Sequence, residues 1–204
     1  MANDSSKELT SIWTPANIVT CVRIVFIPIF MVFASFARSE SGAYSLGLSV
    51  AAFVLYMLLS LTDKVDGYLA RSRNEITDFG KFLDPIADKL LVFSALLILL
   101  EQGMVGVAPV FIILLREFLV SALRMVASAN GVVVAADKLG KWKTATTMVS
   151  LCGYLLVFVL SASGSSLGGP ILLASQVLMF VAVILTVVSG IQYFWNCREV
   201  VFRV

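Results

Sequence analysis

Apolar residues of this chain form six long runs that are separated by shorter polar segments. A helix needs about 20 predominantly apolar residues to cross the hydrocarbon core of a bilayer. Each run approaches that length, so we expect six membrane-spanning helices. They are predicted at residues 17–37, 45–65, 82–101, 106–128, 144–163 and 170–194. The pattern therefore predicts an all-α bundle that forms one domain over residues 1–204, with residues 1–16 as an N-terminal juxtamembrane segment.

The basic residues predict how this bundle is oriented. Six spans place both termini on the same side of the membrane, and nine basic residues fall on that side: Lys7, Arg71, Arg73, Lys81, Lys138, Lys141, Lys143, Arg198 and Arg203. The opposite side carries Arg38 alone. Because lysine and arginine accumulate on the cytoplasmic side, we expect both termini in the cytoplasm. Two interpretations stay open for residues 7–15, a short interfacial helix with Trp13 among the headgroups or a frayed polar terminus.

Composition narrows the chemistry that the chain can carry. Hydrophobic residues make up 59% of it, charged residues 14%, and the mean hydropathy is +0.96, which excludes a soluble enzyme or a disordered chain. The net charge of +2 is too small to indicate a nucleic-acid partner. The sequence has no histidine, and its three cysteines form no CxxC pair, so neither a histidine base nor a zinc site is indicated. Carboxylates remain the main candidates for chemistry.

Four aspartates lie where the second predicted helix ends and the third begins. Asp63 and Asp66 are three residues apart, and Asp84 and Asp88 are four apart, so each pair shares one helical face. Singly, each would be an ordinary solvated acid, but four together repel one another unless a cation binds. A site of carboxylates alone suits a hard ion, Mg²⁺ or Mn²⁺. Since Pro85 favours the first turn of a helix, we expect the third helix to begin close to Asp84.

These aspartates belong to a longer pattern, D-x2-D-G-x2-A-R-x8-G-x3-D-x3-D, which runs from Asp63 to Asp88 with all eight fixed positions matched. In this pattern the chain resembles the CDP-alcohol phosphotransferases. The resemblance implies a six-helix membrane fold that is usually dimeric. It also implies a reaction in which a CDP-linked lipid donates its phosphatidyl group to an alcohol and CMP is released.

The resemblance also implies roles for individual residues. Asp63, Asp66 and Asp84 match metal-binding carboxylates, and Asp88 matches the general base and is a further expected metal contact; we expect two ions. The positions expected to contact the CDP-linked lipid or line its pocket are Asn17, Ile18, Val19, Thr20, Gly67, Arg71, Thr77 and Gly80.

A second polar cluster bears on the acceptor. It comprises Arg116, Arg124, Lys138, Lys141 and Lys143, and topology does not require the two arginines because they lie within the fourth predicted span. Cations near a phosphotransfer centre suit an acceptor that carries a phosphate, with glycerol 3-phosphate the obvious candidate. These five residues are therefore the expected acceptor-phosphate ligands. Glu117 is nearly aligned with Arg124 on one face, either to neutralise a nearby arginine or to take part in the site.

From residue 17 to residue 144 the chain is similar to bacterial members of the family that use glycerol 3-phosphate. We therefore expect transfer of phosphatidyl from CDP-diacylglycerol to glycerol 3-phosphate, in phospholipid biosynthesis, at the cytoplasmic face of a bacterial membrane. The acyl chains are expected to lie among the membrane lipids. The alternatives are another acceptor, phosphatidylglycerol or inositol phosphate, and, from another class, a cation-coupled transporter. Against a transporter, the acids lie at helix ends and no paired broken helices are evident.

Overall fold

The computed structural model describes residues 14–39, 42–72, 78–129 and 138–201, with the side chains of 16, 63–72, 78, 81, 129, 138 and 199–201 left undescribed. Six helices occupy almost all of these residues: α1 (Pro15–Phe36), α2 (Leu46–Ser72), α3 (Asp78–Glu101), α4 (Val107–Ala129), α5 (Lys138–Ala162) and α6 (Gly168–Val201). Within the described ranges there is no strand, only an isolated bridge between Arg38 and Tyr44. The all-α class and the six predicted helical segments are confirmed.

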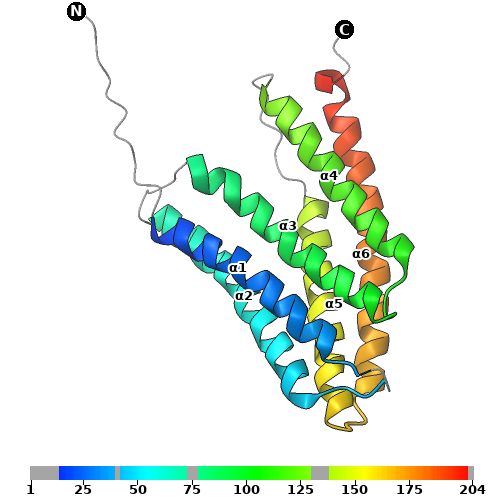
Figure 1. Ribbon diagram of the computed structural model, residues 1–204. Helices are drawn as coiled ribbons and strands as arrows, with labels where there is room; N and C mark the ends of the chain where they lie inside the picture. The colour runs from blue at the N-terminus through cyan, green and yellow to red at the C-terminus, as the bar shows by residue number, and fades with distance from the viewer. Residues whose placement is uncertain (1–13, 40–41, 73–77, 130–137, 202–204) are drawn as a thin grey trace, which may run out of the picture.

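The helices alternate in direction along the bundle (Figure 1). α1, α3 and α5 begin at the upper end in that view, and α2, α4 and α6 end there. α1 packs on α2 and α3, α5 packs on α6 and α2, and α4 packs on α6. The upper end therefore collects the N-terminal turns of three helices and the C-terminal turns of the other three.

Three of the six helices contain stretches that are long and apolar enough to cross a membrane, at residues 17–36, 139–162 and 168–198. α2 has a shorter apolar stretch at residues 46–62. α3 and α4 carry several charged side chains within their length, including Asp84, Asp88, Arg116 and Glu117. The chain is thus a multi-pass membrane protein in which two helices, α3 and α4, carry charged side chains within their length.

α3 corrects one expectation from the sequence. It begins at Asp78, so the prediction that this helix starts close to Asp84 is wrong, and Pro85 lies inside it. The reason is that a proline removes one backbone hydrogen bond, here the one to the carbonyl of residue 81, while the turns on either side keep theirs. α1 accommodates Pro28 in its interior in the same way. The extra turns carry Gly80 into the helix, one turn before Asp84.

Small residues allow the helices to approach closely, as is usual in membrane bundles. Ala34, Ala52 and Ala95 are fully buried in the core. At Gly153 on α5, an added Cβ would lie 2.2 Å from Ser175 Oγ and 3.3 Å from Ser175 Cβ on α6. The Ser175 hydroxyl is itself bonded to the carbonyl of Ile171 at 2.8 Å. α5 and α6 therefore meet where only glycine fits.

Gly153→Leu is expected to destabilise the bundle, because the new side chain must push α6 away or break the Ser175 bond. Overpacking of this kind costs about 1–3 kcal/mol. The measurement is the thermal unfolding midpoint of purified protein in detergent. Gly47→Leu on α2 is the matched control, since an added Cβ there meets nothing within 4 Å. Equal midpoints for the two variants would contradict close packing at Gly153.

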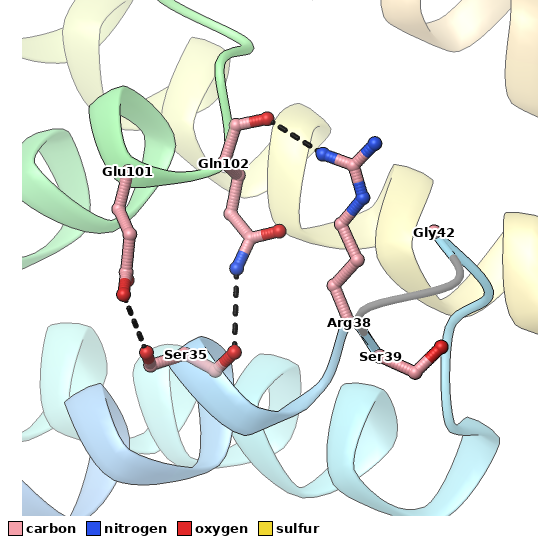
Figure 2. A pocket seen from close by; sticks show the side chains of 6 residues that line it. All are labelled: Ser35, Arg38, Ser39, Gly42, Glu101 and Gln102. Carbon is pink, nitrogen blue, oxygen red and sulfur yellow. Dashed lines mark hydrogen bonds between the residues drawn. The ribbon is translucent and has the colours of Figure 1, made fainter.

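At the lower end of the bundle, polar contacts join α1 to α3 (Figure 2). Arg38 Nη1 donates to the carbonyl of Gln102 at 2.9 Å. Ser35 Oγ donates to Glu101 Oε1 at 2.8 Å, and Gln102 Nε2 donates to the carbonyl of Ser35 at 3.4 Å. These bonds hold the C-terminal ends of α1 and α3 together, at the opposite end of the bundle from the N-terminal turns of these helices.

Candidate functional site

The start of α1 is fixed by a cap. The Thr14 side chain accepts a hydrogen bond from the backbone N–H of Asn17 at 3.3 Å, and Pro15 occupies the first turn, where its missing N–H costs nothing. Asn17 and Thr20 are buried, and Val19 is half-buried. Ile18 is 43% exposed and so faces away from them. The cap therefore aims one face of the first turns of α1 into the bundle.

That face of α1 contacts the aspartates of α3. Thr20 Oγ1 donates to Asp84 Oδ1 at 2.9 Å. One turn further along, Arg23 Nη1 donates to Asp88 Oδ1 at 3.0 Å. Because Asp84 and Asp88 are also one turn apart, the two helices meet through two parallel polar contacts. Both carboxylates are thereby held from the same side.

Arg23 also joins α2 to this pair of helices. Its Nε donates to Thr62 Oγ1 at 3.3 Å, and the residue is only 1% exposed. Neither Arg23 nor Thr62 was among the site residues expected from the sequence. The available signal was an arginine inside a long apolar run, where a charge is costly and usually functional. A buried guanidinium thus links Thr62 of α2 to Asp88 of α3.

α2 continues to Ser72, so Asp63 directly follows Thr62 on the same helix, with Asp66 three residues further on. The side chains of Asp63, Asp66, Gly67 and Arg71 belong to the undescribed part, as does the whole of Thr77. Gly80 is described and is buried on α3. Among the described side chains, no three potential metal ligands lie together. Asp84 and Asp88 supply two carboxylates, and the α2 backbone carries two more at the same end of the bundle (Figure 1).

The chemistry of these donors fits a hard divalent cation. Every candidate ligand is a carboxylate, the kind of oxygen donor that Mg²⁺ and Mn²⁺ prefer. Asp84 is half-buried, whereas the Asp88 side chain is 52% exposed. One side of Asp88 is held by Arg23, and its exposure leaves room for another group. The Asp88 carboxylate is therefore bound by Arg23 on one side and open on another.

A second polar cluster lies between α4, α5 and α6. Glu117 Oε1 accepts from Arg116 Nη1 at 3.2 Å and from Lys143 Nζ of α5. Arg116 Nη2 donates to Ser189 Oγ of α6 at 3.1 Å. The side chains of Arg116 and Glu117 are 14% and 18% exposed, and Lys143 is buried. The expectation that Glu117 neutralises a neighbouring arginine is met at Arg116, and Lys143 shares the same oxygen.

Arg116 has room because α6 carries a glycine beside it. A Cβ at Gly190 would lie only 3.1 Å from Arg116 Cγ. Within the described part of the chain, the buried Arg116 Nε has no hydrogen-bond partner. A buried donor without an acceptor is costly unless a ligand or water supplies one. The N–H groups of Arg116 and Lys143, together with the Arg116 Nε–H that has no partner, suit a bound anion.

The other basic candidates are not part of this cluster. Arg124 and Lys141 are exposed, and Lys138 is the first residue of α5, with an undescribed side chain. Arg124 lies two turns beyond Glu117, where α4 packs on α6 through Val120, Tyr193 and Cys197. Among the described residues, this buried cluster has no member from α3 or α5, and Arg124 is exposed although it shares a helical face with Glu117. The structure therefore brings Arg116 and Lys143 together and leaves Arg124 and Lys141 outside.

Comparison with known proteins gives one consistent result. Residues 13–188 match the CDP-alcohol phosphatidyltransferase family. A CDP-diacylglycerol–glycerol-3-phosphate 3-phosphatidyltransferase of Bacillus subtilis is 41% identical over 187 residues, covering 87% of this chain and 92% of the relative. A protein of the same name from Rickettsia felis is 37% identical, covering 90% and 94%. A probable phosphatidylglycerophosphate synthase of Mycobacterium tuberculosis is 36% identical, covering 87% and 78%.

Proposed function

Because the chain belongs to the CDP-alcohol phosphatidyltransferase family, we propose that it transfers the phosphatidyl group of CDP-diacylglycerol to glycerol 3-phosphate and releases CMP. The observation that carries this proposal is the pairing of Asp88, held by Arg23, with a cation cluster on neighbouring helices at the same end of the bundle. The Asp88 carboxylate suits an acceptor hydroxyl that must lose a proton, and the cation cluster suits the phosphate of the acceptor.

In this proposal the acceptor hydroxyl attacks the lipid-side phosphorus of the donor. A new oxygen–phosphorus bond forms, the bond to the bridging oxygen of CMP breaks, and CMP leaves with that electron pair. Asp88 takes the hydroxyl proton, and Arg23 keeps the carboxylate turned toward the site. Arg116 and Lys143 bind the acceptor phosphate through charge-assisted hydrogen bonds. Thr20 orients Asp84 through its hydroxyl.

Members of this family generally depend on a divalent metal. Asp63, Asp66, Asp84 and Asp88 would hold two ions, Mg²⁺ or Mn²⁺, and such ions would neutralise the charge of the diphosphate and so favour attack on its phosphorus. Asn17, Gly67, Arg71, Thr77 and Gly80 belong to the donor pocket in this proposal. Burial of Asn17 and Gly80 supports their part in it. Ile18 contributes through its backbone, since its side chain faces outward.

We place the protein in a bacterial cytoplasmic membrane with six spans and both termini in the cytoplasm. The support is the excess of basic residues at the end where the helices meet the termini, together with the apolar stretches of four helices. The site then faces the cytoplasm, where CMP and glycerol 3-phosphate are soluble, and the acyl chains stay in the bilayer. A homodimer completes the proposal by resemblance to the family.

The test is CMP release by purified protein given CDP-diacylglycerol and Mg²⁺, with and without glycerol 3-phosphate. We expect release to require both the acceptor and the metal, and to stop when a chelator removes the metal. Inositol phosphate, phosphatidylglycerol and glycerol are the comparison acceptors. If phosphatidylglycerol were the only acceptor that supports release, the proposal of a phosphate-monoester acceptor would be wrong, while the transfer of a phosphatidyl group to an alcohol would stand. Absence of release with every alcohol would overturn the transferase itself.

A further inference from the structure

Lys89 directly follows the proposed base but faces another helix. Consecutive residues leave a helix about 100° apart, so Asp88 and Lys89 point to different neighbours. Asp88 contacts Arg23 of α1, whereas Lys89 Nζ donates to Ser121 Oγ of α4. One turn of α3 therefore connects the acidic site to the helix that carries Arg116 and Glu117.

Ser121 ties Lys89 to the cation cluster. Its hydroxyl accepts from Lys89 and donates at 2.7 Å to the carbonyl of Glu117, one turn earlier on α4. Lys89 is thus linked through one hydroxyl to the residue whose carboxylate binds Arg116 and Lys143, and the three cations come from three different helices.

The charges of this group do not balance. Arg116 and Lys143 pair with the single carboxylate of Glu117, and Lys89 adds a third cation next to them through Ser121, so these four described side chains carry an excess of two positive charges. Burying uncompensated charge is costly. A phosphate monoester carries about −1.5 to −2 at neutral pH and has three strong acceptor oxygens. Its charge and its hydrogen-bonding capacity both match what the cluster lacks, including an acceptor for Arg116 Nε.

We infer that Lys89 is a third phosphate-binding cation beside Arg116 and Lys143, and that Glu117 is the positioning residue that holds these cations in one place. The inference rests on the proposed function and makes it more specific. A lysine ammonium has three N–H groups, and Ser121 takes one of them. Since Lys89 and Asp88 lie on one turn of α3, the inference requires a single acceptor that carries both a hydroxyl and a phosphate.

The experiment compares an acceptor with and without its phosphate. In wild-type protein and in Lys89→Gln, kcat and KM are measured for glycerol 3-phosphate and for glycerol. We expect kcat/KM for glycerol 3-phosphate to fall about tenfold to a hundredfold, mainly through KM, the loss typical of a hydrogen bond to a charged group. The value for glycerol should not change. Arg198→Gln is the matched control, an exposed cation at the same end of the bundle, and should change neither value.

Glu117 is tested in the same assay through Glu117→Gln and Glu117→Asp. The glutamine variant is expected to raise KM for glycerol 3-phosphate about tenfold, because Arg116 and Lys143 lose their shared anion. The aspartate variant should recover part of that loss, since it restores the charge with a shorter reach. A purely structural role for Glu117 would lower the use of both acceptors equally and would overturn its positioning role.

Failure of the inference can be told apart from failure of the proposed function. If Lys89→Gln leaves KM for glycerol 3-phosphate unchanged, or impairs glycerol equally, Lys89 does not bind the phosphate. If another phosphorylated alcohol proves to be the acceptor, the same comparison is made with that alcohol and its phosphate-free form. If no acceptor supports release, the affinity of purified protein for inorganic phosphate is measured by titration. Equal phosphate affinities in wild-type protein and Lys89→Gln would contradict the inference that Lys89 binds phosphate.

Discussion

Replacing Asp88 with asparagine is expected to lower kcat for CMP release by about 10²–10⁴-fold, the usual contribution of a general base. The carboxamide has nearly the same shape and can still accept a hydrogen bond from Arg23 Nη1, so the contact between α1 and α3 survives. What it cannot do is take the proton of the attacking hydroxyl. The measurement is steady-state CMP release at saturating donor and acceptor, with the unfolding midpoint recorded in parallel.

Two controls separate this role from others. Glu101→Gln makes the same chemical change at the far end of α3, where the carboxylate contacts only Ser35 among the described bonds, and should leave kcat unchanged. Raising Mg²⁺ distinguishes a base from a metal ligand, because added metal restores an occupancy defect but not a missing proton acceptor. Recovery of full kcat at high Mg²⁺ would show that Asp88 acts through the metal alone.

The positions of the helices could be predicted from the sequence because each coincides with a predominantly apolar run, although charged residues interrupt the runs of α3 and α4. Their ends were harder to predict where charges interrupt that signal. α2 runs on through Asp63 and Asp66 to Ser72, beyond its apolar stretch, and α3 begins at Asp78 although Pro85 argues for a later start. Hydropathy reports burial in lipid, whereas backbone hydrogen bonding continues past the membrane boundary, so the two signals end at different residues.

The acidic residues of the site could be predicted because their spacing along two helices is local information. Their partners could not be predicted, because contacts such as Thr20 with Asp84 join residues 64 positions apart in the sequence. The same limit applies to the cations. Arg124 and Arg116 have similar sequence contexts, yet only Arg116 meets α5 and α6, and Lys143 proves to be buried although its position suggested a topological charge.

The second large effect is expected at Arg23. Arg23→Met keeps an unbranched side chain but removes the donors to Asp88 and Thr62. The Asp88 carboxylate then has no hydrogen bond from α1 to fix its orientation. We expect kcat to fall about tenfold to a hundredfold, in line with the loss of a hydrogen bond between charged groups. Arg23→Lys should lie between wild type and Arg23→Met, because one ammonium cannot reproduce the two directions of the guanidinium fork.

A buried arginine that joins three helices also stabilises the fold, so activity and stability must be separated. Arg38→Met is the matched control, since Arg38, just after α1, donates to the carbonyl of Gln102, just after α3, at the other end of these two helices. Both variants should lower the unfolding midpoint, but only Arg23→Met should lower kcat in protein that remains folded. If kcat falls in proportion to stability in both variants, Arg23 acts through the fold alone. If kcat falls only in Arg23→Met, the function of this buried charge near the start of α1 is to orient Asp88.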